Sequence, residues 1–232
     1  MTDTAIDSTR RDVEVIALVS TAHGMSHFYQ LVLPPLFPFI THEFGISYGE
    51  VALTTGLFYA TSGLAQTPAG FLVDRFGARN VLLGGLALAA ASAGLIGLVP
   101  SFWMMLPLVV LAGLGNCVFH PADYSILTHT VSPKRMARAY GAHTLSGNIG
   151  WTLAPVTMLG LASAVGWRGA LFAVSLLGLA IVLAFAARSG ALHAERGGRR
   201  AKSAAKGAPH FSYLTLLASP AILLCFAYFV LL

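Results

Sequence analysis

The sequence has few charged residues. Asp, Glu, Lys and Arg make up 10% of the 232 residues and hydrophobic residues make up 56%, whereas ordinary soluble domains carry about 25% charged residues. So few charges cannot cover a water-exposed surface, and the mean hydropathy of +0.74 agrees with this. The composition therefore excludes an ordinary soluble domain. It predicts an all-α polytopic membrane protein, because helices satisfy their own backbone polar groups in lipid.

Cysteine and catalytic motifs are scarce as well. Cys117 and Cys225 lie inside apolar runs, where a thiol is usually a small packing residue. The sequence has no phosphate loop, no Ser-His-Asp arrangement in a catalytic context and no cysteine spacing for a metal. We therefore expect no enzymatic activity and no cofactor. The net charge of +5 comes from short basic clusters between apolar runs, so no nucleic-acid partner is expected.

Apolar runs long enough to cross a bilayer recur along the chain. About 20 apolar residues span the hydrocarbon core, and the prolines inside the longer runs are the expected bend points. These are Pro34, Pro35, Pro38, Pro121 and Pro155. We expect transmembrane helices at residues 15–40, 51–73, 81–99, 102–127, 139–164, 170–187 and 211–232.

The basic residues predict the orientation of these spans. Of the 14 Lys and Arg residues, all but Arg168 fall on one side of the alternating topology. Cytoplasmic loops retain Lys and Arg, so the N-terminus is expected in the cytoplasm.

Four regions follow from the spans. Residues 1–14 are expected to form a cytoplasmic tail, 15–187 a six-span bundle, 188–209 a basic cytoplasmic linker and 210–232 a seventh span. The last region stops inside an apolar run, which favours truncation. The expected partners of the bundle are the lipid bilayer and either a C-terminal six-helix half or a second copy of the chain.

Spans one, two, four and five carry polar residues at helical spacing. Unpaired polar groups in hydrocarbon cost several kcal/mol each, so these faces should meet one another or water. We expect them to line a cavity for a small-molecule substrate. Its candidate residues are His23, His27, Gln30, Tyr59, Asn116, His120, Asp123 and His143. The shared spacing on spans one and four, which run in opposite directions, is typical of a 3+3 inverted repeat.

His120 and Asp123 raise a specific question, because they lie one helical turn apart in an apolar run. Their side chains are expected to meet. They could form a neutralised structural pair, Asp123 could be hydrated near the headgroups, or the pair could bind and release a proton. A metal site of His23, His27, His120 and Asp123 is a further alternative, because His at i and i+4 is a common ligand spacing. The sequence favours the proton over the metal.

The segment GFLVDRFGARN, residues 70–80, resembles the signature loop of the major facilitator superfamily. The matching positions are Gly70, Asp74, Arg75, Gly77 and Arg79, with Asn80 in place of the last basic residue. Gly70 permits a close helix contact and Gly77 a tight turn. The resemblance implies that this loop latches two transporter halves in the outward-facing state, with Asp74 as its central charge.

Two other stretches depart from the family pattern. Leu111 stands where such transporters often have a span-four arginine, so another titratable group has to serve if protons drive transport. Span five partly resembles the antiporter signature, at Gly141, Gly150 and Pro155. That helix favours export, or it is a glycine-rich packing helix.

The stretches VFHPADYS and YGAHTLSGNIGWTLAP, together with HGMSHFYQ, resemble the branch that includes fosmidomycin-resistance exporters. The resemblance implies proton-coupled export of a drug-like or amphipathic compound across the bacterial inner membrane. Two alternatives stay open, which are proton-symport uptake of a small metabolite and a non-transporting half-transporter or membrane partner protein.

Overall fold

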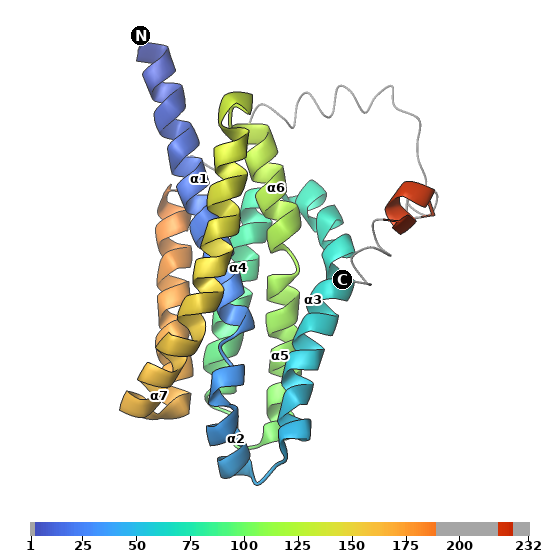
Figure 1. Ribbon diagram of the computed structural model, residues 1–232, viewed down its shortest axis with the longest axis vertical. Coiled ribbons are helices and arrows are strands. Elements are labelled where there is room, and N and C mark those ends of the chain that lie inside the picture. Colours follow the sequence, from blue (N-terminus) through green and yellow to red (C-terminus); the bar gives the residue numbers. More distant parts are fainter. Residues whose placement is uncertain (1–2, 189–217, 225–232) are drawn as a thin grey trace. The chain divides into compact units, whose positions relative to one another are not determined.

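The computed structural model describes residues 3–188 and 218–224, and the chain divides into two units, Met1–Ala194 and Glu195–Leu232. All regular structure in these described residues is helical. Figure 1 shows the first unit as a bundle of long helices. Its elements are α1 (Asp3–Gln30), η1 (Pro34–Leu36), α2 (Phe37–Phe44), α3 (Tyr48–Phe76), α4 (Ala78–Ile96), α5 (Phe102–Asn116), α6 (Phe119–Thr130), η2 (Pro133–Arg135) and α7 (Met136–Arg188).

The second unit is described only at residues 218–224, where an exposed helical stretch begins at residue 220. The expected linker from residue 189 onward and most of the seventh span lie outside the described residues, so both stay predictions.

α1 ends where two prolines follow. Pro34 and Pro35 have no N–H to donate to the carbonyls of Gln30 and Leu31, so α1 stops at Gln30 and the 3-10 helix η1 begins at Pro34. The expected helix at 15–40 is therefore interrupted by a non-helical segment at residues 31–33. α1 also starts at residue 3, so most of the expected tail is helical.

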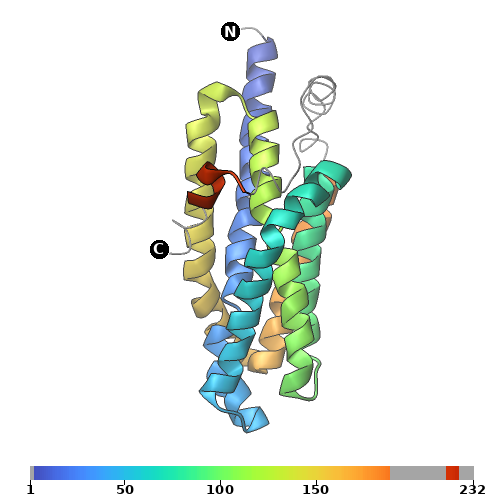
Figure 2. The same ribbon diagram turned by 90° about the vertical axis from the view of Figure 1, so that its right-hand side faces the viewer.

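The turn between α2 and α3 is built from local signals. Gly45 ends α2 in the left-handed region, with φ 64° and ψ 30°. Ser47 then caps α3, because its hydroxyl accepts from the backbone N–H of Glu50 while the Glu50 carboxylate accepts from the backbone N–H of Ser47. These two caps fix the reversal of the chain at this end of the bundle (Figure 2).

Most of the segment that resembles the superfamily signature is helical, and Gly77 is the one residue of it that lies between two helices. Gly77 joins α3 to α4 with φ 84° and ψ 138°, so the expected tight turn is confirmed. The Asn80 amide donates to the carbonyl of Phe76 at 3.1 Å and caps the end of α3. A Cβ on Gly70 would meet nothing within 4 Å among the described residues, so the close helix contact expected there stays a prediction.

The expected span at 102–127 is interrupted, and α7 bends between two expected spans. α5 ends at Asn116 and α6 begins at Phe119, since Pro121 has no N–H to offer the carbonyl of Cys117 one turn earlier. In α7, Gly166 is not helical, with φ 77° and ψ 162°. Figure 1 shows two antiparallel arms of α7 on either side of it, matching the runs expected at 139–164 and 170–187.

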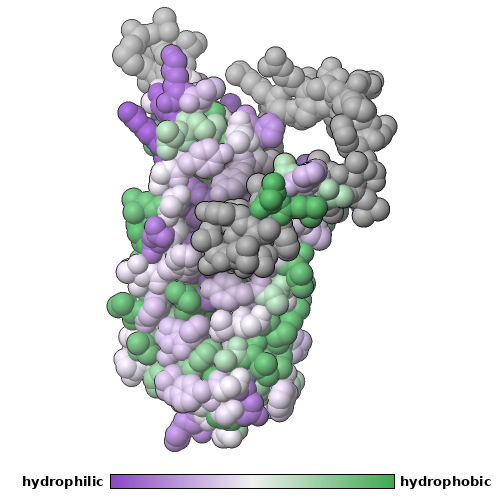
Figure 3. Space-filling model, turned by 45° about the vertical axis from the view of Figure 1, so that its right-hand side comes forward, coloured by the Kyte–Doolittle hydropathy of each residue, from purple (hydrophilic) through white to green (hydrophobic). Residues whose placement is uncertain are grey.

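Three segments are long and apolar enough to cross a membrane, namely Ala78–Ile96, Phe102–Thr130 and Pro133–Arg188. α1 and α3 have sufficient length, at 28 and 29 residues, but they carry more polar residues. Large apolar side chains face outward, for example Leu64 at 82% and Val156 at 71% exposed. Figure 3 shows hydrophobic residues along the flanks of the surface. This pattern suits lipid, while α1 and α3 as spans stay a prediction.

Polar networks tie the chain together near each end of the bundle. In the Asp12 network, the Asp12 carboxylate accepts from Arg135 at 2.9 Å and from the Ser132 hydroxyl at 2.6 Å. This network joins the first turns of α1 to the α6–α7 connection.

In the Glu43 network, the Glu43 carboxylate accepts from Arg168 at 2.7 Å and from the Trp167 indole at 2.6 Å. The same Arg168 donates to the carbonyls of Gly97 and Val99, both at 2.9 Å. Arg168 thereby satisfies carbonyls that the end of α4 leaves without helical partners. The network joins α2, the α4–α5 turn and the bend of α7.

α1 packs chiefly against α7, and glycines set the closeness of this contact. A Cβ on Gly150 would collide with the carbonyl oxygen of Gly24, and a Cβ on Gly24 would lie 3.0 Å from the carbonyl oxygen of Ser146. The two backbones therefore touch, as small residues allow between membrane helices. This contact places the polar faces of α1 and α7 side by side.

Candidate functional site in the polar interior

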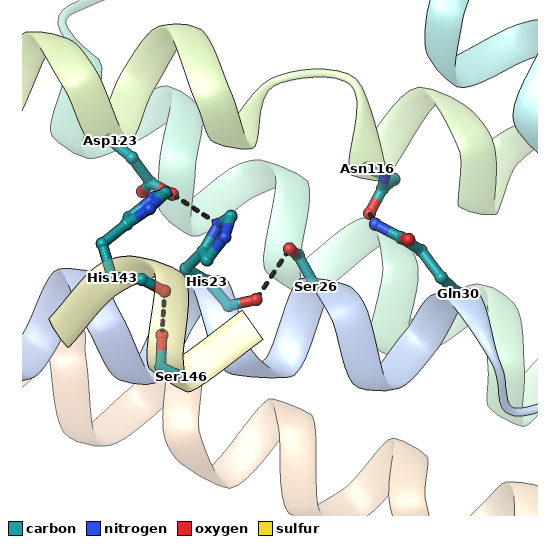
Figure 4. A network of polar contacts seen from close by, with 7 residues as sticks. All are labelled: His23, Ser26, Gln30, Asn116, Asp123, His143 and Ser146. Atoms are coloured by element: carbon teal, nitrogen blue, oxygen red, sulfur yellow. Dashed lines mark hydrogen bonds and ion pairs between the residues drawn. The ribbon is translucent and has the colours of Figure 1, made fainter. Parts of the chain in front are cut away.

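Asp123 on α6 is the centre of a buried polar cluster. The residue is fully buried, and its Oδ2 lies 3.1 Å from Nε2 of His143 on α7 and 3.2 Å from Nδ1 of His23 on α1. The His143 nitrogen is aligned for a hydrogen bond, whereas the His23 nitrogen is close enough for attraction but not aligned for one. The rings of the two histidines stack, with centroids 3.5 Å apart. Figure 4 shows Asp123 facing both of them.

Two further histidines extend this cluster. His27, one turn after His23, has its ring centroid 4.4 Å from that of His23, and His120 has its centroid 5.3 Å from that of His23. Gly147 forms the floor beneath them, because a Cβ there would lie 3.0 Å from Nε2 of His23 and 3.1 Å from Nδ1 of His27. The histidine cluster is therefore His23, His27, His120 and His143 around Asp123.

The pairing expected from the sequence differs from the one found. His120 and Asp123 share a helix, yet the ion-pair contacts of Asp123 run to His23 and His143. The reason is the close packing of α1 against α7, which brings two histidines from other helices to the buried carboxylate. The ring of His120 instead lies at 73° to that of His23 and has its centroid 5.8 Å from that of Tyr124.

A second polar group lies one to two turns away along α1. The amide of Gln30 donates to Asn116 at 3.5 Å, and the amide of Asn116 donates to the Ser62 hydroxyl at 2.9 Å. The Trp151 indole donates to Gln30 at 3.0 Å, and its ring lies 4.4 Å from that of His27. Side chains from α1, α3, α5 and α7 thus meet here, the four helices from which a cavity was expected.

Trp151 was not identified from the sequence. It lies one turn beyond Gly147 on the face of α7 that carries His143, and this register was the available signal. Its hydrogen bond to Gln30 is what connects the second polar group to the histidine cluster.

The other expected residues lie elsewhere. Tyr59 is 44% exposed on α3, with its ring against Phe58. Gly141 is exposed and a Cβ there would meet nothing within 4 Å, unlike Gly150 on the same helix. Pro155 lies inside α7, a turn beyond Trp151.

The signature loop lies at the end of α3. Asp74 and Arg75 are exposed there, and the Arg75 guanidinium lies over the ring of Phe76 at 5.3 Å. Arg79 is half-buried in the first turn of α4.

The chemistry available to the histidine cluster follows from its burial. A carboxylate removed from water needs a compensating positive charge or hydrogen bonds, and Asp123 still has one oxygen, Oδ1, without a hydrogen-bond partner among the described residues. Imidazoles can supply that compensation by taking up a proton or by sharing a cation. The cluster can therefore hold and exchange a positive charge in the interior of the bundle.

Residues 17–232 match the family model of the Major Facilitator Superfamily. The chain belongs to the major facilitator superfamily. The interior polar face and the apolar exterior described above are thus those of a membrane protein of this superfamily.

Curated relatives agree with this assignment. The chain is 25% identical over 198 residues to the uncharacterized MFS-type transporter YfnC of Bacillus subtilis, which covers 82% of this chain and 47% of that protein. It is 25% identical over 147 residues to the fosmidomycin resistance protein of Escherichia coli, covering 63% and 36% of the two chains. It is 31% identical over 145 residues to a multidrug resistance protein B homolog of Mycobacterium tuberculosis, covering 61% and 26%.

These matches span about half or less of the length of each relative. The relatives carry transporter or drug-resistance names, which is the class of protein that the sequence predicted.

Proposed function

We propose that the chain forms the N-terminal half of a secondary transporter that exports a small drug-like or amphipathic compound, with the proton gradient as the driving force. The family assignment supports the transporter class, and the drug-resistance names of two relatives support export. In this proposal the first unit spans the bacterial inner membrane six times as a 3+3 repeat, with a cytoplasmic N-terminus. It works against a C-terminal six-helix half or a second copy of the chain.

The observation that carries the proposal is the fully buried Asp123 held between histidines of two other helices. A charged side chain inside a membrane bundle is costly and is normally retained for transport or coupling. Leu111 replaces the arginine that serves in many relatives of this type, so the Asp123 cluster is the coupling group in this proposal.

Export can be tested in inverted membrane vesicles that hold the full-length protein and an imposed pH gradient. Ethidium and fosmidomycin are suitable probes, and proton release on adding each probe is followed with a pH-sensitive dye. We expect proton movement coupled to at least one probe, and we expect Asp123→Asn to reduce it to the level of vesicles without the protein. His129→Gln, an exposed site on the same helix, is the matched control.

The alternatives give different results. Wild-type coupling in Asp123→Asn contradicts the proposal. Probe accumulation in intact cells that rises on expression indicates uptake. Tolerance of both Asp123→Asn and Asp74→Ala, in an assay of the partner complex, indicates a non-transporting protein.

A further inference from the structure

The histidine cluster has the composition and spacing of a metal site. Two overlapping groups, His23 with His27 and His120, and His23 with Asp123 and His143, each bring their ligand atoms within 4.8 Å of one another. His23 belongs to both groups. Four imidazoles therefore converge on one buried region with a single carboxylate beside them.

Hydrogen bonding alone does not account for this convergence. Both ring nitrogens of His27 are buried without a hydrogen-bond partner among the described residues, as is Oδ1 of the fully buried Asp123. A neutral imidazole has one donor and one acceptor nitrogen. Leaving both unsatisfied in a buried place costs free energy, so an additional occupant that accepts the nitrogen lone pair is favoured.

The orientation of the rings fits a metal as that occupant. Nδ1 of His23 faces the carboxylate of Asp123, which leaves Nε2 of His23 as its free ligand atom. Nε2 of His23 and Nδ1 of His27 both lie against Gly147, 3.0 and 3.1 Å from where a Cβ would be. A histidine that turns one nitrogen to a carboxylate and the other to the ion is the usual support of a histidine ligand.

We propose that His23, His27 and His120 bind a divalent transition-metal ion of the Zn²⁺ class, with Asp123 orienting His23 and balancing the charge. Imidazole nitrogen suits Zn²⁺, Co²⁺, Ni²⁺ and Cu²⁺, whereas Mg²⁺ and Ca²⁺ prefer oxygen. Metal–nitrogen distances of about 2.0–2.1 Å require the three rings to converge from the spacing found, and the absence of a side chain on Gly147 leaves room for that movement. The same cluster is the coupling group of the proposed function, but metal binding is measured on the protein itself and does not depend on transport.

The test is a Co²⁺ titration of the purified protein in nanodiscs, carrying an affinity tag without histidine. We expect one Co²⁺ per chain with the visible absorption of a low-coordinate nitrogen site, displacement by Zn²⁺ and no displacement by excess Mg²⁺. His27→Gln and His120→Gln, both half-buried positions, should each weaken Co²⁺ binding by about 10-fold or more. His42→Gln, at an exposed site, should leave it unchanged.

A rescue variant separates ligation from packing. His27→Cys keeps a ligand at the position and should restore Co²⁺ binding with a thiolate charge-transfer band. The proposal is overturned if the wild type shows no saturable Co²⁺ binding. It is also overturned if binding survives in both His27→Gln and His120→Gln, or if it is lost in His42→Gln, because the metal then sits on the surface. Whether or not Co²⁺ binds, the result does not decide the export assay, which measures proton movement on adding a probe.

Discussion

Gly150 determines how closely α1 can approach α7. Because a Cβ at this position would collide with the carbonyl oxygen of Gly24, we expect Gly150→Ala to lower the free energy of unfolding by about 1–3 kcal/mol, the usual cost of overpacking. The two helices would separate and His23 would move away from His143. Thermal unfolding in detergent measures the effect.

Gly160→Ala is the control for this substitution. A Cβ at Gly160, further along the same helix, would meet nothing within 4 Å, so the higher helix propensity of alanine should make this variant neutral or slightly more stable. Equal losses in both variants would contradict the close-contact explanation.

Glu43 is expected to make the stability of the fold depend on pH. The hydrogen bond from Arg168 lowers the pKa of the Glu43 carboxyl below its ordinary value. A carboxyl whose pKa is lowered by folding contributes stability above its unfolded pKa, and this contribution is lost as the pH falls through the folded pKa. The wild type should therefore exceed Glu43→Gln in stability at neutral pH, by at most about 1 kcal/mol because the pair is partly exposed.

The comparison is made by thermal unfolding at neutral pH and at about pH 3, below the ordinary range of a carboxyl group. The advantage of the wild type should shrink or vanish in acid. An advantage of the same size at both pH values would show that the ion pair with Arg168 is not its source.

At this scale the sequence predicted most of the polar residues that lie in the interior, but it wrongly included Tyr59, which is 44% exposed, and it did not predict all of their partners. His23, His27, His120, Asp123 and His143 do lie together. The contacts of Asp123 with His23 and His143 depend on how closely α1 packs against α7. The spacing of residues along one helix gives no information about that distance. Trp151 was not predicted for the same reason, because its hydrogen bond is to Gln30 on another helix.

At the scale of elements, the bend in α7 depends on one backbone conformation. Gly166 has φ 77° and ψ 162°, a region that is nearly restricted to glycine, and residues held there cost about 1–3 kcal/mol. A Cβ on Gly166 would meet nothing within 4 Å. We therefore expect Gly166→Ala to lower stability by that amount through the backbone alone.

Gly45→Ala is a useful comparison, because Gly45 also has open space around it but lies in the left-handed helical region, with φ 64° and ψ 30°. Placing alanine in that region costs about 1–2 kcal/mol, so Gly45→Ala should lose less stability than Gly166→Ala. A Gly166→Ala variant as stable as the wild type would show that the bend does not need glycine.

Most elements could be predicted from apolar length, and their ends from proline and glycine. The run at 51–73 lies inside α3, the run at 81–99 begins inside α4 and extends three residues beyond its end at Ile96, and the prolines at 34 and 35 mark the end of α1. The interruption at residues 117–118 was harder to predict, because Pro121 acts on a carbonyl four residues earlier. The 3+3 repeat stays a prediction, since helix order alone does not test it.

At the scale of the whole molecule, the orientation in the membrane can be tested with single cysteines. Lys134 and Val165 are exposed near opposite ends of the first long arm of α7. In a background with Cys117→Ala and Cys225→Ala, Lys134→Cys should react with a membrane-impermeant maleimide only from the cytoplasmic side. Val165→Cys should react only from the other side.

Intact cells and inverted vesicles expose the two sides in turn, and a permeant maleimide controls for reactivity at each position. The reverse pattern would invert the proposed topology. Labelling of both cysteines from one side would show that this arm of α7 does not cross the membrane.

The Asp12 network also bears on how the chain is made. The hydrogen bond from Arg135 to Asp12 joins residues 123 positions apart, and α7, the principal packing partner of α1, lies later still. At about 5–20 residues per second, synthesis separates the emergence of the two by on the order of ten seconds. During that interval the imidazoles of α1 have neither their carboxylate nor the glycine face of α7. The polar face of α1 therefore gains its buried partners only after α6 and α7 have been made.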